Sequence, residues 1–86
     1  MSAATQIASS KFDAKFFALP AGIQERIQSK IDAMGGRLKT FPHYRMEGAD
    51  TYRLRVGDYR IIYQFEVDRN ELFLIALGHR SEIYRR

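Results

Sequence analysis

Apolar and polar residues follow two different periods along this chain, and the change of period divides it into halves. In the first half one apolar stripe recurs every three or four residues: Ile23, Ile27, Ile31 and Met34. This spacing predicts an amphipathic helix. The phenylalanines of the preceding segment, 11–19, lie at a similar spacing and predict a shorter helix.

Residues at the ends of these segments set the expected helix boundaries. Ser9 or Ser10 is a candidate N-cap, because a short hydroxyl can accept a hydrogen bond from a free amide of the first turn. Pro20 suits the first turn of the second helix. Gly35 and Gly36 are expected to end that helix through a left-handed cap. The first half therefore predicts a helical hairpin with a tight Leu19-Pro20 corner.

The second half alternates with a period of two residues, as in strands. Leu54 and Val56 point to one side, and Arg53 and Arg55 to the other. Gly57-Asp58 follows as a two-residue hairpin turn, with glycine first as type II′ prefers. The next strand is expected over residues 59–67.

The remaining segments complete the expected fold. Residues 72–77 are apolar on both faces and predict an interior strand. Residues 5–9 predict a short N-terminal strand. Residues 37–50 show no period and are interpreted as a basic, aromatic loop, and no helix is expected in the polar tail 79–86. The expected fold is α+β, in the order β-α-α-β-β-β, with the helical hairpin packed on an antiparallel sheet.

Composition narrows the class of protein. The chain has 86 residues and no cysteine, which predicts one domain over 1–86 and excludes disulfides and thiolate chemistry. No apolar run approaches the roughly 18–20 residues of a membrane span. The first ten residues lack the features of a secretory signal. We therefore expect a cytoplasmic protein without membrane contact.

The charge is basic and unevenly placed. The formal net charge is +4, and most of the excess lies in residues 37–86. The isoelectric point near 9.7 makes polyanions plausible partners, although simple solubility explains charge alone equally well.

The expected hairpin places three arginines on one face of the sheet. A two-residue turn sets Arg55 opposite Arg60, and Arg53 opposite Ile62. Like charges that face each other destabilise a hairpin, which indicates an anionic ligand among them. The alternative is a set of surface arginines whose stems cover the sheet.

The tail adds further cations and one aromatic ring: His79, Arg80, Tyr84, Arg85 and Arg86. Guanidinium groups match phosphate oxygens, and a tyrosine ring can stack on an unpaired base. This combination favours single-stranded RNA over duplex DNA. The sequence contains no glycine-rich phosphate loop and no spacing typical of metal ligands, so we expect neither cofactor nor metal.

Two stretches together resemble a known family. Tyr52 to Tyr63, and Ala76 to Tyr84, closely resemble the RelE family of the RelE/ParE toxin superfamily of type II toxin–antitoxin systems. The Leu19-Pro20 corner fits as well. The resemblance implies an mRNA interferase, an endoribonuclease that enters the ribosomal A site on the 30S subunit and cleaves translated mRNA there. The 2′-hydroxyl attacks the adjacent phosphate without metal and leaves a 2′,3′-cyclic phosphate.

The resemblance also assigns roles to individual residues. Arg53, Arg55 and Arg60 match the residues that hold the phosphate. Arg80 matches the residue at the departing 5′-oxygen, and Tyr84 the stacking residue. Three further cations are expected to contact RNA: Arg45, Arg85 and Arg86. His79 is a possible acid or base, because the ordinary pKa of histidine suits proton transfer.

The resemblance implies partners. These are mRNA, the ribosome and a RelB-like, acidic antitoxin that folds on binding, with operator DNA reached only through the antitoxin. Three alternatives stay open: a ParE-like inhibitor of DNA gyrase, a non-catalytic RNA- or ribosome-binding domain, and an inactive relative.

Overall fold

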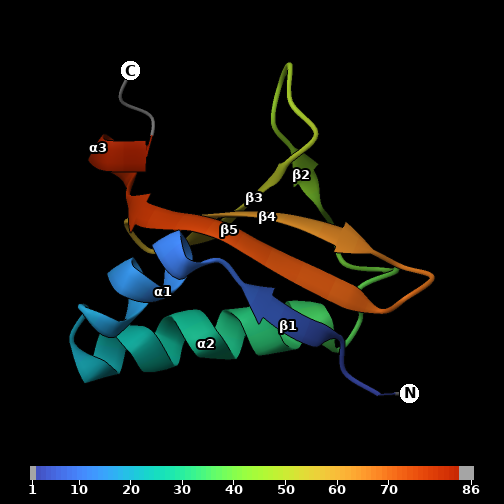
Figure 1. Ribbon diagram of the computed structural model, residues 1–86, viewed down its shortest axis with the longest axis horizontal. Coiled ribbons are helices and arrows are strands. Elements are labelled where there is room, and N and C mark those ends of the chain that lie inside the picture. The colour runs from blue at the N-terminus through green and yellow to red at the C-terminus, as the bar shows by residue number, and fades with distance from the viewer. Residues whose placement is uncertain (1, 84–86) are drawn as a thin grey trace.

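The computed structural model describes residues 2–83 and contains five strands and three helices in that part of the chain (Figure 1). In chain order the elements are β1 (Thr5–Ala8), α1 (Ser10–Phe17), α2 (Ala21–Gly35), β2 (Tyr44–Arg45), β3 (Tyr52–Val56), β4 (Tyr59–Glu66), β5 (Glu71–His79) and α3 (Arg80–Ile83).

The strands form one sheet in the order β1-β5-β4-β3-β2. β2 to β5 pair antiparallel, whereas β1 joins β5 in parallel, so the predicted antiparallel sheet has one parallel edge strand. β5 lies between β1 and β4, which confirms the interior strand predicted from its apolar faces. The α+β class is confirmed.

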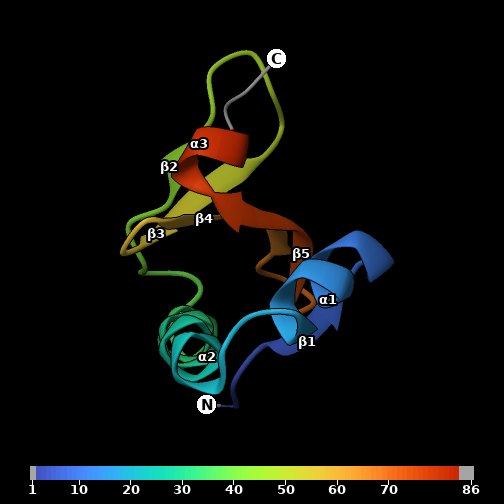
Figure 2. The ribbon, with the colours of Figure 1, turned by 90° about the vertical axis from the view of Figure 1, so that its left-hand side faces the viewer.

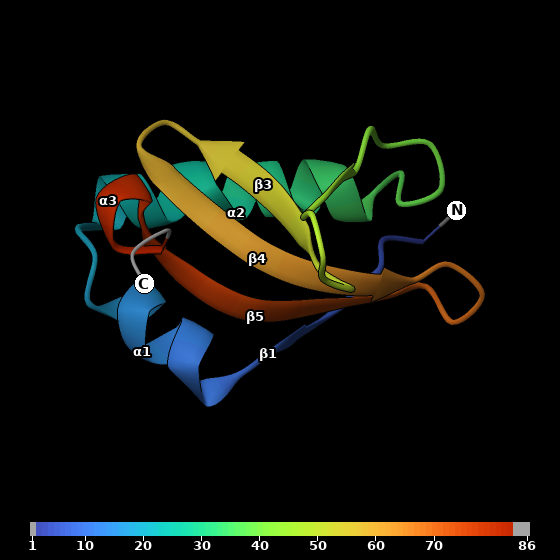
Figure 3. The same ribbon diagram turned by 90° about the horizontal axis from the view of Figure 1, so that it is seen from above.

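Two layers are visible in the fold, with α1 and α2 together on one face of the sheet (Figures 1 and 2). The predicted stripe of α2 supplies the centre of the core, where Ile27, Ile31 and Met34 are fully buried. The strands meet it with Leu54, Val56, Ile61, Tyr63, Leu72, Leu74 and Leu77. Seen from above, β3 and β4 lie in front of α2 (Figure 3).

The helix boundaries follow the expected signals with one exception. Ser9 is the N-cap of α1, and its hydroxyl accepts a hydrogen bond from the amide of Phe12 at 3.0 Å. Pro20 directly precedes α2 with φ −58°. The left-handed cap was wrong: Gly36 ends α2 with φ −74°, in the right-handed region. Gly35 instead lies against the N-terminal segment, and its carbonyl accepts from the amide of Ala4 at 2.9 Å.

The predicted hairpin between β3 and β4 is confirmed. Val56 pairs with Tyr59 across the turn. Gly57 has φ +60°, and Asp58 is not in the positive-φ region, as a type II′ turn requires. A glycine therefore stands at the position where a side chain would be strained.

Two predictions were incomplete. The segment 37–50 contains the short strand β2, which pairs with Tyr52 and Arg53. Two paired residues are too few to produce a readable period in the sequence. The polar tail begins with the short helix α3, which contacts β4 and β5. Strand β5 also continues past Gly78 to His79.

Candidate nucleic-acid interface

The candidate site lies on the sheet face that α1 and α2 leave uncovered. Leu54 and Val56 point into the core, so the alternate residues Arg53 and Arg55 point to the opposite side. In the observed register Arg55 pairs with Arg60, and Arg53 pairs with Ile62, as the two-residue turn predicts. Directly opposed residues of antiparallel strands share a face, so the three arginines share this one.

Arg60 differs from the other two in its surroundings. Arg60 is only 6% exposed, whereas Arg53 and Arg55 are exposed to solvent. One terminal nitrogen of Arg60 donates to the carbonyls of Gly57 and Tyr59, each at 3.3 Å. These bonds to the turn hold the guanidinium in place. The face therefore combines a fixed, buried cation with two cations exposed to solvent.

Arg80 is tied to the same turn through its backbone. Its amide donates to the carbonyl of Asp58 at 2.7 Å, and the residue itself is exposed at the start of α3. The short helix thus begins beside the hairpin turn that positions Arg60. The structure brings Arg53, Arg55, Arg60 and Arg80 to one end of the sheet.

His79 lies on the other side of the sheet. It pairs with Tyr59, which packs against the core, and it lines a hollow with Ile23 and Arg26 of the helix layer. Its Nδ1 lies 3.1 Å from Ser81 Oγ, and the ring contacts Tyr59 edge-on. The structure therefore does not bring this histidine to the arginine face.

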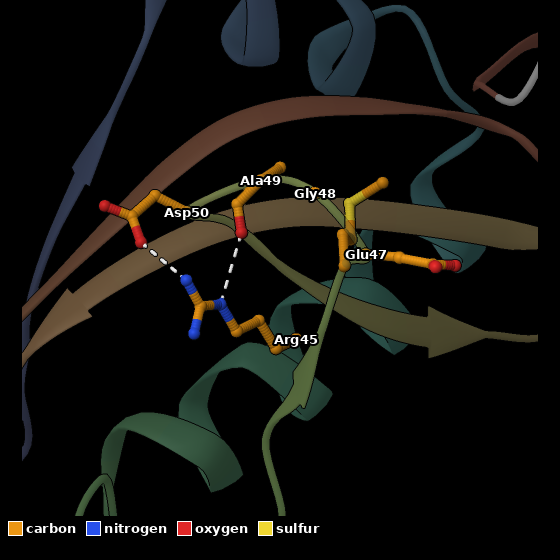
Figure 4. A pocket seen from close by; sticks show the side chains of 6 residues that line it. Arg45, Glu47, Gly48, Ala49 and Asp50 are labelled. Atoms are coloured by element: carbon orange, nitrogen blue, oxygen red, sulfur yellow. Dashed lines mark hydrogen bonds and ion pairs between the residues drawn. The ribbon is translucent and has the colours of Figure 1, made fainter.

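Arg45 is held within its own loop. Its guanidinium contacts Asp50 at 3.2 Å and donates from Nε to the carbonyl of Ala49 at 3.2 Å (Figure 4). Gln64 of β4 donates to the Asp50 carbonyl at 3.0 Å and ties this loop to the sheet. The loop rises from the sheet on the same side as α3 (Figures 1 and 2). Part of the charge of Arg45 is already matched by a carboxylate.

The second histidine, His43, has a structural role. Nε2 lies 2.7 Å from the Leu38 carbonyl and Nδ1 lies 2.6 Å from the Tyr63 hydroxyl. A carbonyl only accepts, so Nε2 carries a proton, and in the neutral ring Nδ1 accepts from Tyr63. The ring also stacks on Phe65 with centroids 3.9 Å apart. Burial, followed by the neighbouring Tyr52, raises the pKa of Tyr63, which keeps this hydroxyl a donor.

Sequence reasoning assigned no role to Tyr44, which the structure places beside the arginines. It pairs with Arg53 and therefore lies on the arginine face, with its residue 65% exposed. The signals in the sequence were its position in a basic, aromatic loop and the fit of the stretch 44–48 to the family resemblance. Tyr84, Arg85 and Arg86 lie outside the described residues.

Within residues 2–83, no group of three or more histidine, aspartate or glutamate residues could hold a metal ion. No helix in the same range is long and apolar enough to cross a membrane.

Comparison with solved structures shows the class of the fold. The chain is similar to isolated Escherichia coli RelE toxin, with a TM-score of 0.76, 20% identity, and coverage of 95% of this chain and 92% of that one. It is similar to the archaeal RelE of a RelE–RelB complex from Pyrococcus horikoshii, with a TM-score of 0.76, 22% identity, and coverage of 94% and 99%. The fold is that of RelE toxins.

Sequence comparison shows the family. The model of the ParE toxin of the type II toxin–antitoxin system parDE matches residues 7–84, and the chain belongs to this family of the RelE/ParE superfamily. The resemblance stated from the sequence is thereby confirmed. The chain is also 36% identical to Toxin RelG of Mycobacterium tuberculosis over 42 residues, which are 49% of this chain and 48% of RelG. That match spans about half the length of the curated relative.

Proposed function

We propose that this toxin is a metal-independent endoribonuclease that cleaves mRNA in the ribosomal A site. The observation that carries the proposal is the opposition of Arg55 and Arg60 on the sheet face that α1 and α2 leave uncovered, with Arg53 alongside and Arg80 starting at the same turn. Guanidinium groups at this spacing suit the oxygens of a phosphate. Because its target would be the translating ribosome, the toxin would act in the cytoplasm.

In the proposed reaction RNA supplies its own nucleophile. The 2′-hydroxyl gives its proton to solvent water, and the 2′-oxygen attacks the adjacent phosphorus. The bond from phosphorus to the 5′-oxygen breaks, which yields a 2′,3′-cyclic phosphate and a 5′-hydroxyl. Arg53 and Arg55 hold the phosphate oxygens, while the fixed cation of Arg60 stabilises the charge that grows in the transition state. Arg80 stabilises the departing 5′-oxygen, which takes up a proton from solvent water.

The remaining assignments follow from the resemblance and from the geometry. Tyr84 stacks on the base and helps to place the 2′-hydroxyl, and Arg85 and Arg86 contact RNA. Because His79 faces the helix layer, we assign it no acid or base role. The nucleophile and its phosphate are already neighbours in RNA, so orientation and electrostatic stabilisation supply most of the rate.

We also propose an antitoxin partner. Pyrococcus RelE has been solved as a complex with RelB, which supports a RelB-like partner for this chain. An acidic segment that folds on binding would complement the basic second half of the chain. Operator DNA would be reached through that partner.

The test is mRNA cleavage in a purified translation system. Wild type is compared with Arg55→Ala and Arg80→Ala. Arg69→Ala, which removes an exposed arginine from the turn between β4 and β5, is the matched control. We expect cuts within translated codons for wild type and the control, loss of cutting in the two site variants, and intact mRNA without ribosomes. The new 3′ ends should carry cyclic phosphate. If folded wild-type protein leaves the translated message uncut, the proposal is wrong.

A second candidate function is inhibition of DNA gyrase, which the family model of the ParE toxin favours. A supercoiling assay with purified gyrase distinguishes the two. Inhibition that survives Arg55→Ala, together with an uncut message, would establish the second candidate in place of the first.

A further inference from the structure

A hollow of about 450 Å³ opens at the outer edge of β3, beside the arginine face. It is lined by Lys30, Phe41, Pro42, Tyr44, Arg53, Leu54 and Arg55. Strand β2 pairs only with Tyr52 and Arg53, so within the described residues no strand covers the rest of this edge. The hollow forms where β2 ends early and α2 brings Lys30 towards β3.

Tyr44 is 65% exposed, and the residues just before it are held by contacts of their own. His43 is fixed by its contacts with the Leu38 carbonyl and the Tyr63 hydroxyl. Phe41 is half-buried against the core and lies under the guanidinium of Arg37. These contacts anchor the segment just before Tyr44, while Tyr44 itself is exposed to solvent. Because the backbone before Tyr44 is already held, its exposed ring can receive a base without ordering this segment first.

The lining of the hollow is cationic. It includes Lys30, Arg53 and Arg55, and none of the lining residues is acidic. Arg53 and Arg55 also belong to the arginine face, so the hollow and the candidate site are continuous across β3. A chain with regularly spaced phosphates could contact both.

We propose that this hollow binds one unpaired nucleotide of single-stranded RNA, adjacent to the nucleotide at the arginine face. The base stacks on Tyr44 and the phosphate lies between Lys30 and Arg53. The proposal rests on the proposed function and extends it, because it adds a second nucleotide position. Cations alone would suit an acidic peptide equally well. The exposed ring beside them favours RNA, since stacking and charge together are the usual means of holding unpaired bases.

The test is equilibrium binding of a fluorescent single-stranded RNA octamer with 2′-O-methyl groups, which lacks the attacking hydroxyl. The full chain is compared with Tyr44→Ala, Tyr44→Phe and Lys30→Ala. Phe17→Ala is the matched control for the ring, because Phe17 is 69% exposed on α1, and Lys11→Ala is the control for the charge. Stacking predicts that Tyr44→Ala weakens binding at least about fivefold, whereas Tyr44→Phe stays within about twofold. Lys30→Ala should reduce the salt slope by about one.

An abasic nucleotide moved along the octamer separates stacking from a structural effect. At one position the loss of the base should abolish the effect of Tyr44→Ala, because the ring then has nothing to stack on. If Tyr44→Ala binds like Phe17→Ala, or if no abasic position removes its effect, the proposal is wrong. It is also wrong if an oligoglutamate peptide, and not RNA, binds in a Tyr44-dependent way.

This result is independent of the cleavage assay. Tyr44-dependent RNA binding without mRNA cleavage would keep the nucleotide site and remove the proposed reaction. Cleavage with unchanged binding in Tyr44→Ala would do the reverse.

Discussion

Arg55 and Arg60 lie directly opposite each other across β3 and β4, yet only Arg60 is buried. Its guanidinium donates to the carbonyls of Gly57 and Tyr59, whereas Arg55 is exposed to solvent. The two arginines therefore have separable roles. Arg60 supports the turn and fixes a positive charge, and Arg55 is the accessible cation of the pair.

This difference predicts opposite effects on stability. Arg60→Ala should lower the free energy of unfolding by about 1–3 kcal/mol, because it removes a buried side chain and its bonds to the turn. Arg55→Ala should leave stability unchanged or raise it by up to about 1 kcal/mol, because it relieves a like-charge pair. Urea unfolding measures the free energy of unfolding of both variants, with Arg69→Ala as the control. Equal losses in the two variants would show that Arg55 is also structural.

The contact between His43 and Tyr63 predicts a second stability effect. Tyr63→Phe leaves Nδ1 of His43 without its donor at 2.6 Å, and should cost about 1–3 kcal/mol. Tyr44→Phe removes an exposed hydroxyl and serves as the control. If both variants unfold at the same urea concentration, the hydrogen bond contributes nothing to stability.

The same residue predicts how stability depends on pH. Burial raises the pKa of Tyr63 above its ordinary range, whereas the pKa of a tyrosine in the unfolded chain is about 10. Above that pH the unfolded chain holds fewer protons than the folded one, so the free energy of unfolding falls as the pH rises. The fall should approach about 1.4 kcal/mol per pH unit. It should be absent below pH ~9 and much smaller in Tyr63→Phe, as urea unfolding at several pH values would measure. A variant as steep as wild type would assign the titration to another group.

The N-cap of α1 predicts a difference between two adjacent serines. Ser9 caps the helix and also donates to the carbonyl of Ile75 at 2.6 Å, whereas Ser10 is exposed. Ser9→Ala should therefore lower the free energy of unfolding by about 1 kcal/mol or more, and Ser10→Ala by a few tenths of a kcal/mol. Thermal unfolding compares them, and a larger loss in Ser10→Ala would contradict the observed cap.

The parts of the fold that the sequence predicted are those that a repeating pattern specifies. The stripe that ends at Met34 defined α2, and alternation around Gly57-Asp58 fixed which arginines face each other. These features depend on local geometry alone. The choice between Ser9 and Ser10 needed the structure, because either hydroxyl satisfies the local rule.

The features that were missed depend on contacts between distant segments. Alternation places Arg60 on a face but does not reveal that it is buried and bound to the turn. The role of His43 depends on Tyr63, twenty residues further along the chain. Likewise, β2 is identified by its partner strand, which is why Tyr44 was left without a role. For the candidate site, the sequence predicted the register of the hairpin arginines and left open which side His79 would face.

The ion pair between Arg45 and Asp50 predicts an effect on RNA binding rather than on stability. Both side chains are largely exposed, 65% and 89%, so the pair contributes little to folding, and Asp50→Asn should change the unfolding free energy by less than about 1 kcal/mol. The substitution removes the carboxylate that partly matches the charge of Arg45, and the loop stays tied to the sheet through Gln64. Affinity for the uncleavable octamer should therefore rise, and its salt dependence should steepen. Glu47→Gln, an equal change of charge at an exposed residue of the same loop that forms no ion pair with Arg45, is the control. A rise of the same size in both variants would indicate a general effect of net charge, and a rise confined to Asp50→Asn would show that releasing Arg45 lets it contact RNA.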